Sequence, residues 1–195
     1  YFYSLLSAIE HFNKYDLTIF DIKQVSIHAG SIRFYVAKKN SNRAKIISEN
    51  VKLLLREEKL KAYNKIDSFK LFSKKIEKTK KQLIELLKKI KKEGKTVAGY
   101  GASGRANTII QYCGITDDLV SYMIDDSPAK VGYYTPGSHL EIFSSSVLNT
   151  EKAPDYILVF AWSFFDEIVK RNKKFIDQQE VKIILPLPEV KVVSF

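Results

Sequence analysis

The chain has 195 residues, of which 45% are hydrophobic, and its formal net charge is +10. This length and apolar content allow a sizeable core, in one large or two small domains. The single cysteine, Cys113, excludes an internal disulfide and a cysteine-cluster zinc site, and the three histidines lack metal-ligand spacing. No metal site is predicted in these residues, and a reducing, cytoplasmic setting is expected.

Residues 1–41 are predicted to form a helix followed by an antiparallel hairpin. Residues 3–14 look helical, and the β-rich runs 18–27 and 31–38 are joined by the short turn His28-Ala29-Gly30. His28 is a candidate substrate-binding residue, and the alternative is a turn histidine that bonds its own backbone. Since the chain opens at Tyr1 in the middle of an apparent element, we expect the complete protein to start well upstream.

Residues 42–94 are predicted to be a helical connector, with helices at 42–61 and 67–93. Asn42 and Asp67 are expected to cap their N-termini, and Gly94 to close the second helix. Most of the net charge lies between residues 42 and 95, which contain 18 Lys and Arg against 7 Asp and Glu.

The lysines of the second helix are expected to lie on a solvated face. Apolar residues recur at steps of three and four along one face, namely Phe69, Phe72, Ile76, Leu83, Leu86 and Ile90, with Thr79 among them. No aromatic or glycine-rich element interleaves the lysines, as a stacking platform for nucleic acid would require. We therefore predict no nucleic-acid partner.

Residues 95–195 are predicted to form an α/β domain with a Rossmann-like parallel sheet and helices on both faces. Strands are expected at 96–100, 119–124, 140–143, 156–161 and 181–187, and helices at 105–113 and 164–178. The longest apolar run, residues 156–165, is about half of the roughly 20 residues that span a membrane, so no membrane segment is predicted.

The stretch TVAGYGASGRANTII contains a G-x-G-x-x-G pattern between a strand and a helix. Gly99 is expected to permit the tight turn, Gly101 to let a phosphate approach the backbone, and Gly104 to let the helix pack closely on its strand. The exposed N–H groups of the helix start, with Arg105, would hold a diphosphate. The candidate ligand-binding residues of this segment are Gly99, Gly101, Ser103, Gly104, Arg105 and Asn107. The alternative is a glycine turn that binds nothing.

Two further loops supply candidate ligand contacts. Asp125 or Asp126, about 20 residues after the glycine loop, would accept from a ribose hydroxyl, unless the pair only forms a turn before Ser127-Pro128. The loop that contains Tyr134, Thr135, Pro136 and Gly137 offers hydroxyls and a Pro-Gly turn, with an ordinary surface turn as the alternative.

Several stretches in order resemble the C-terminal domain of SAM-dependent C-methyltransferases that act on nucleotide-linked deoxysugars. They are GYGASGRANTIIQYCGI, SYMIDDSPAKVGYYTPGSHLEI, DYILVFAWSFFDEI and IILPLPEVKVV. The stretches YFYSLLSAIEHF and VSIHAGSIRFYV are similar to the last helix and hairpin of that family's SAM-binding class I methyltransferase domain. The resemblance covers nearly the whole chain.

This resemblance implies an enzyme of which the chain is the C-terminal part, with the nucleotide sugar bound between the SAM-binding and C-terminal domains. Most of the S-adenosylmethionine site, a zinc-binding region and the catalytic residues would lie upstream of Tyr1, so no catalytic role is assigned and the chain alone is expected to be inactive. The glycine loop would then support the diphosphate of a nucleotide sugar. Two alternatives stay open: an NAD-binding oxidoreductase fragment, and a non-catalytic nucleotide-binding module. The oligomeric state is not predicted.

Overall fold

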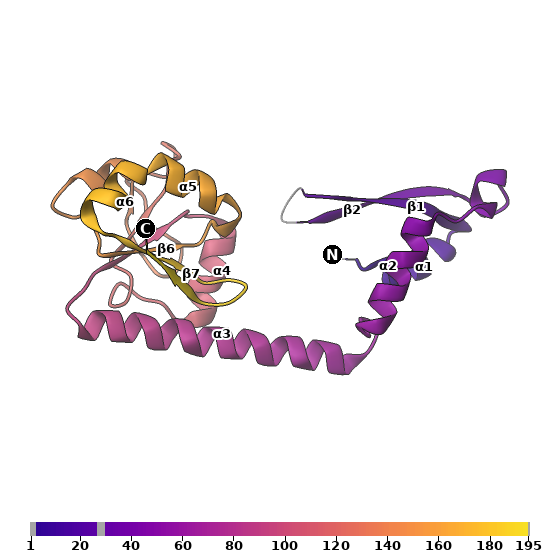
Figure 1. Cartoon of the computed structure of the whole chain (residues 1–195), viewed down its shortest axis with the longest axis horizontal. Coiled ribbons are helices and arrows are strands. Elements are labelled where there is room, and N and C mark those ends of the chain that lie inside the picture. The colour runs from indigo at the N-terminus through magenta and orange to yellow at the C-terminus, as the bar shows by residue number, and fades with distance from the viewer. Residues whose placement is uncertain (1–2, 27–29, 195) are drawn as a thin grey trace. The chain divides into compact units, whose positions relative to one another are not determined.

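The structure is a computed structural model that describes residues 3–26 and 30–194. The chain forms two compact units, Tyr1–Lys75 and Ile76–Phe195, which are indigo to purple and magenta to yellow in Figure 1. Each unit has its own hydrophobic core. The expected division into 1–41, 42–94 and 95–195 stays a prediction.

The first unit contains the expected helix and antiparallel hairpin. Its elements are α1 (Leu5–Asn13), β1 (Leu17–Val25), β2 (Ser31–Lys38), the 3-10 turn η2 (Asn42–Lys45) and α2 (Glu49–Leu60). Helices α1 and α2 pack with the hairpin around Leu5, Ala8, Ile19, Ile22 and Val51. Partly buried side chains of β2, such as Phe34, pack against this cluster, so the small core joins four elements of the chain.

A buried glutamate ties α2 to the start of α1. The carboxylate of Glu58 is 4% exposed and accepts the backbone N–H groups of Leu5 and Leu6, both at 2.8 Å. The Ser4 side chain accepts a third N–H, from Ser7. The first turn of α1 therefore has partners for N–H groups that a helix start leaves without intrahelical acceptors.

The predicted start of α2 at Asn42 is wrong. Asn42 opens only the 3-10 turn η2, and α2 begins at Glu49 with Ser48 as its N-cap, which accepts the N–H of Val51 at 3.3 Å. Serine and asparagine are both good caps, so the local sequence allowed either start.

The connector continues in α3 (Ile66–Lys92), a helix of 27 residues. The prediction that Asp67 caps this helix is wrong, because Asp67 lies inside its first turn. Gly94 does end the helix: its φ is +71°, and the next N–H, of Lys95, returns to the carbonyl of Ile90 at 3.2 Å.

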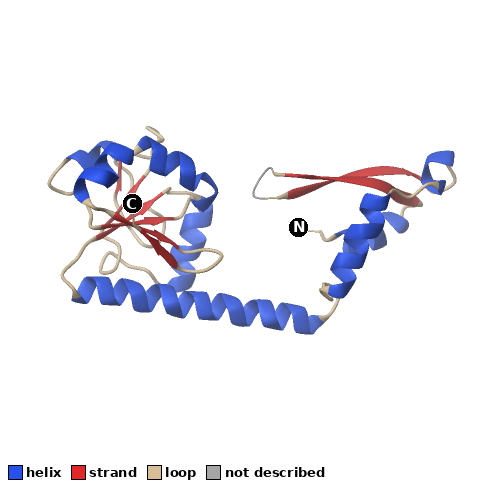
Figure 2. Ribbon diagram, in the orientation of Figure 1, coloured by secondary structure: helices blue, strands red, loops and turns tan. Residues whose placement is uncertain are grey.

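The second unit is built on a six-stranded sheet in the order β5-β4-β3-β6-β7-β8, parallel except for the last pair. Its elements after α3 are β3 (Val97–Tyr100), α4 (Gly104–Cys113), β4 (Tyr122–Ile124), β5 (Ile142–Phe143), η3 (Ser145–Asn149), β6 (Tyr156–Val159), η4 (Trp162–Phe164), α5 (Phe165–Arg171), α6 (Lys173–Gln179), β7 (Lys182–Leu185) and β8 (Lys191–Val193). Figure 2 shows the red strands between blue helices. The predicted α/β fold is confirmed.

Two details of this unit differ from expectation. The helix expected at 164–178 is two helices, α5 and α6, which meet at Asn172, whose side chain donates to the carbonyl of Ile168 at 2.9 Å. The antiparallel edge strand β8 was not predicted.

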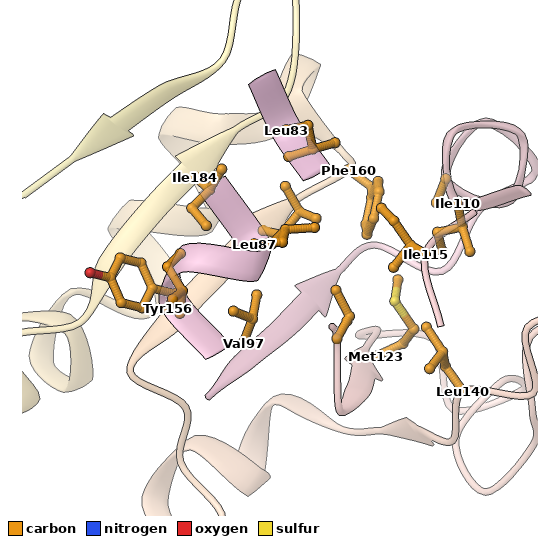
Figure 3. Close-up of a cluster of buried hydrophobic side chains, with 14 of the residues drawn as sticks. Leu83, Leu87, Val97, Ile110, Ile115, Met123, Leu140, Tyr156, Phe160 and Ile184 are labelled. Atoms are coloured by element: carbon orange, nitrogen blue, oxygen red, sulfur yellow. The ribbon is translucent and has the colours of Figure 1, made fainter. Parts of the chain in front are cut away.

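Apolar side chains fill both faces of the sheet because successive strand residues point to opposite sides. On one face, side chains of α3 and α4 meet the strands, and Figure 3 shows Leu83, Val97, Met123 and Phe160 among the labelled members. On the other face, α5 and α6 cover Ala98, Tyr100, Ile157 and Val159. The sheet is thus buried on both sides, as a parallel sheet requires.

The amino edge of the sheet is held by one carboxylate. Asp155, just before β6, accepts the N–H of Thr96 at 2.8 Å, its hydroxyl at 3.0 Å and the ammonium group of Lys95 at 3.0 Å. The Thr96 N–H bond, more than any other contact, lowers the pKa of Asp155. These bonds join the starts of the central strands β3 and β6.

Candidate functional site

The carboxyl ends of β4, β3 and β6 lie side by side at one edge of the sheet. From β3 the chain proceeds to β4 and β5 on one side, and then returns to β6 on the other side. Such a switch point is where open α/β sheets bind ligands. The glycine loop follows β3, Asp125 follows β4, and Ala161 follows β6 closely, so the three loops meet at this edge.

Gly101 is held tightly at this edge. Its φ is +95°, its N–H donates to the carbonyl of Ile124 at 2.7 Å, and its own carbonyl accepts the N–H of Ser103 at 2.9 Å. A Cβ atom here would lie 2.7 Å from the Cβ of Ala161. Glycine is therefore required by the neighbouring chain itself. The predicted role of Gly99 in the tight turn is wrong, because Gly99 lies inside β3 and the turn falls at Gly101; Gly99 is confined instead by the side chain of Met123, which a Cβ there would overlap.

The predicted role of Gly104 in close helix packing is wrong. Gly104 is exposed, and a Cβ on it would meet no atom within 4 Å. In the first turn of α4 the residue that turns toward the sheet is Ala106, which is 1% exposed. The small residue that lets α4 pack on the sheet is therefore Ala106, two positions after Gly104.

The N-terminus of α4 keeps two N–H groups free. Ser103 caps the helix by accepting the N–H of Ala106 at 3.2 Å. The N–H groups of Gly104 and Arg105 have no acceptor in the part of the chain that the structure describes. Free N–H groups and the positive end of the helix dipole together favour an anion.

Arg105 and Asn107 flank this helix start. The Arg105 guanidinium lies 5.5 Å from the centroid of the Trp162 ring, so an aromatic side chain after β6 supports it. The side-chain oxygen of Asn107 is buried and has no hydrogen-bond partner among the described residues. A buried acceptor without a donor costs on the order of 1–3 kcal/mol, so this oxygen suits a donor from water or a ligand.

Asp125 forms the turn that the sequence offered as an alternative. One oxygen accepts the N–H of Ser127 at 2.9 Å, and the other pairs with the Lys130 ammonium group at 3.0 Å. Its side chain is only 12% exposed. Both oxygens are thus engaged within the protein.

The neighbouring Asp126 belongs to a polar network that the sequence did not reveal. Its oxygens accept the Tyr100 hydroxyl at 3.1 and 3.0 Å, and one of them pairs with Arg171 at 2.5 Å. Asn172 donates to the same tyrosine oxygen at 3.3 Å. Burial, together with the bond to Asp126, raises the pKa of Tyr100 to about 12, so this hydroxyl stays a donor at neutral pH.

A pocket of about 210 Å³ opens between this network and the glycine loop. Its lining includes Tyr100, Gly101, Asp126, Phe164, Glu167 and Arg171. From the sequence, Tyr100 and Phe164 could have been proposed as lining residues only because they lie near the ends of β3 and β6. No local sequence pattern indicates Arg171.

The structure places the Tyr134–Gly137 candidates away from the glycine loop. The carbonyl of Pro136 accepts the side chain of Gln111, which is seven residues, or roughly 10 Å, along α4 from Gly104. The Thr135 hydroxyl is buried and accepts the N–H of Leu140 at 2.9 Å. Tyr134 is exposed, and Gly137 adopts a φ of +77° beside Gln111. These contacts are those of a structural turn.

Three further expectations concern residues or sites outside this edge. His28 lies outside the described residues. Among the residues that are described, no group of three His, Cys, Asp or Glu side chains could hold a metal ion, and no helix is long and apolar enough to cross a membrane.

A Rossmann-like sheet with a glycine loop at its switch point is the arrangement that many ligand-binding α/β domains share. The chain belongs to the C-methyltransferase C-terminal domain family, whose model matches residues 26–188. It is also similar to the C-methyltransferase NovU of Streptomyces niveus, with 28% identity over 193 residues. That match covers 99% of this chain and 45% of NovU, so the chain spans less than half of this relative.

Proposed function

We propose that the chain is the C-terminal, substrate-holding part of a methyltransferase. The whole protein would transfer a methyl group from S-adenosylmethionine to a carbon of a keto-deoxysugar linked to a nucleoside diphosphate. Family membership and the likeness to NovU support methyl transfer. The resemblance described under Sequence analysis supports the sugar substrate and the proposal that the chain is inactive alone.

The observation that carries the binding part of this proposal is the start of α4. Two free N–H groups, on Gly104 and Arg105, lie at a helix N-terminus beside a guanidinium group. A diphosphate has the charge and the acceptor oxygens that such a site favours. Asn107 adds an acceptor without a donor, suited to a water or a hydroxyl beside the phosphates.

This chain's share of the reaction is to bind and orient the nucleotide. S-adenosylmethionine supplies an electrophilic methyl group when it is bound, and no described residue is assigned to it. The expectation of zinc likewise concerns residues upstream, and the described side chains form no site that fits it. The general base that removes a proton from the sugar carbon is also assigned upstream.

Thermal unfolding of the chain with different ligands tests the proposal. A ligand that binds only the native state stabilises it by about 1.4 kcal/mol at ten times its Kd. We expect dTDP or UDP at millimolar concentration to raise the melting temperature by a few degrees, and NAD or S-adenosylmethionine to raise it less. A larger shift with NAD would instead favour an oxidoreductase fragment.

A further inference from the structure

The pocket beside the glycine loop differs in charge from the start of α4. Three carboxylates line it, those of Asp125, Asp126 and Glu167, against the single cation Arg171. Lys130 neutralises the first of these acids, but the lining still has more negative than positive charge. A phosphate group is therefore disfavoured inside the pocket, whereas a hydroxyl group, which donates a hydrogen bond, is favoured.

The size of the pocket limits what enters it. Pockets that enclose a whole drug-sized ligand measure about 300–1,000 Å³, and this one measures about 210 Å³. The pocket therefore has room for one ring of a larger molecule. The aromatic ring of Phe164, which is 51% exposed, lies in the lining and offers a flat apolar surface for such a ring.

Asp126 is the lining acid with a fixed geometry and spare acceptor capacity. An ionised carboxylate offers about four acceptor positions. Tyr100 shares its one hydroxyl proton between the two oxygens, and Arg171 donates to one of them, so the orientation of the group is fixed while acceptor positions stay open; the side chain is 33% exposed. Asp125, in contrast, is 12% exposed and already bonds Ser127 and Lys130.

The two sites are close enough to hold adjacent parts of one nucleotide. Gly101 lines the pocket, and the free N–H groups of α4 begin only three residues later, at Gly104. The ribose and the diphosphate of a nucleotide are directly bonded to one another. A ligand with its phosphates at α4 therefore has its ribose within reach of Asp126.

We propose that Asp126 accepts a hydrogen bond from a ribose hydroxyl of the nucleotide, with the ribose in the pocket and the diphosphate outside it at the start of α4. Tyr100 and Arg171 act as positioning residues that hold the carboxylate. This inference rests on the proposed function and adds to it that the domain recognises the ribose of the nucleotide through the carboxylate of Asp126.

Calorimetric titration of the chain tests the inference without any substitution. The nucleotide dTDP is compared with its 3′-deoxy analogue, which lacks the single free sugar hydroxyl, and UDP with its 2′,3′-dideoxy analogue, so base and phosphates stay the same. Loss of a hydrogen bond to a charged acceptor should weaken binding roughly 10- to 100-fold. Equal affinities overturn the inference and leave the proposed function standing, whereas failure of both parent nucleotides to bind overturns both.

The variant Asp126→Asn then identifies the acceptor. It keeps the shape of the side chain and removes its charge, and charge-assisted hydrogen bonds are about twice as strong as neutral ones. The ratio of affinities between nucleotide and analogue should fall to roughly its square root, while pyrophosphate should bind as well as before or better. An undiminished ratio, or weakened pyrophosphate binding, contradicts the assignment. Asp166→Asn, an exposed acid on α5 outside the lining, is the matched control and should keep the full ratio.

Discussion

A Cβ atom on Gly101 would lie 2.7 Å from the Cβ of Ala161, whereas one on Gly104 would meet nothing within 4 Å. The two glycines of one motif are thus under different constraints: Gly101 is limited by the space around it, and Gly104 is not. Gly101 also has a φ of +95°, which disfavours any residue with a side chain.

The first prediction compares alanine at these two positions. Gly101→Ala should lower the free energy of unfolding by more than about 1 kcal/mol, because both the backbone conformation and the space oppose it. Gly104→Ala should raise it by about 0.4–1 kcal/mol, since alanine favours the helix and has room there. Urea denaturation measures both. Equal stabilities would mean that the loop relaxes freely away from Ala161.

The second prediction concerns Arg105 and the proposed diphosphate. Arg105→Ala should weaken the binding of dTDP or UDP by roughly 10- to 100-fold, because a charge-assisted hydrogen bond is lost. The effect should shrink as salt is added. Arg56→Ala, which removes an exposed arginine from α2, is the control and should leave the titration unchanged. Normal binding by the Arg105 variant would remove this residue from the site.

The third prediction concerns the buried carboxylate of Glu58. Glu58→Ala should lower the free energy of unfolding by about 2 kcal/mol or more, because the N–H groups of Leu5 and Leu6 lose their acceptors. Glu57→Ala is the matched control, since its carboxylate is half exposed and pairs with Lys61 at the surface. It should change stability by less than about 1 kcal/mol. Denaturation together with hydrogen exchange at residues 5–8 measures the difference.

The fourth prediction concerns alkaline pH. Burial raises the pKa of Tyr100 and of Tyr122 from 10.0 to about 12. Between these pH values the unfolded chain releases protons that the folded chain keeps, so stability must fall as the pH rises. Below pH 10 the contribution of these groups is fully present.

Tyr122→Phe isolates this effect from the titration of lysines. The variant loses a hydrogen bond to the carbonyl of Lys152, and its stability should fall less steeply than that of the wild type between pH 10 and 12. The exposed Tyr133→Phe should keep the wild-type slope. Identical slopes for all three proteins would refute the assignment of the alkaline loss to buried tyrosine.

The alternation of strands and helices was predictable because each element carries its own signal. Buried parallel strands such as β6 read as short apolar runs, and Gly94 marks the end of α3. Capping was less predictable, since Asn42 and Ser48 are both able to start a helix and only packing decides between them. Strand β8 has no such signal, because its place depends on pairing with β7.

The candidate site was predicted only in part, because some of its contacts join residues that are remote in sequence. The glycine loop is a local pattern, and its place at the carboxyl edge follows from the strand before it. The partners of Asp126 are remote in sequence: Arg171 is 45 residues away, and Asn172 is 72 residues from the Tyr100 that it bonds. Contacts of this kind leave no periodicity in the sequence. The choice between Asp125 and Asp126 depended on them.

The hydrogen bonds that Asp155 accepts from Thr96 and Lys95 fix the register of the two central strands at the edge that faces away from the candidate site. The alignment of β3 and β6 therefore does not depend on the loops at the opposite edge. Those loops are free to diverge in length and chemistry while the frame beneath them stays in place. If the proposed nucleotide binding holds, a protein engineer who wished to change its specificity should therefore leave residues 95, 96 and 155 untouched and exchange the loops that follow β4 and β6.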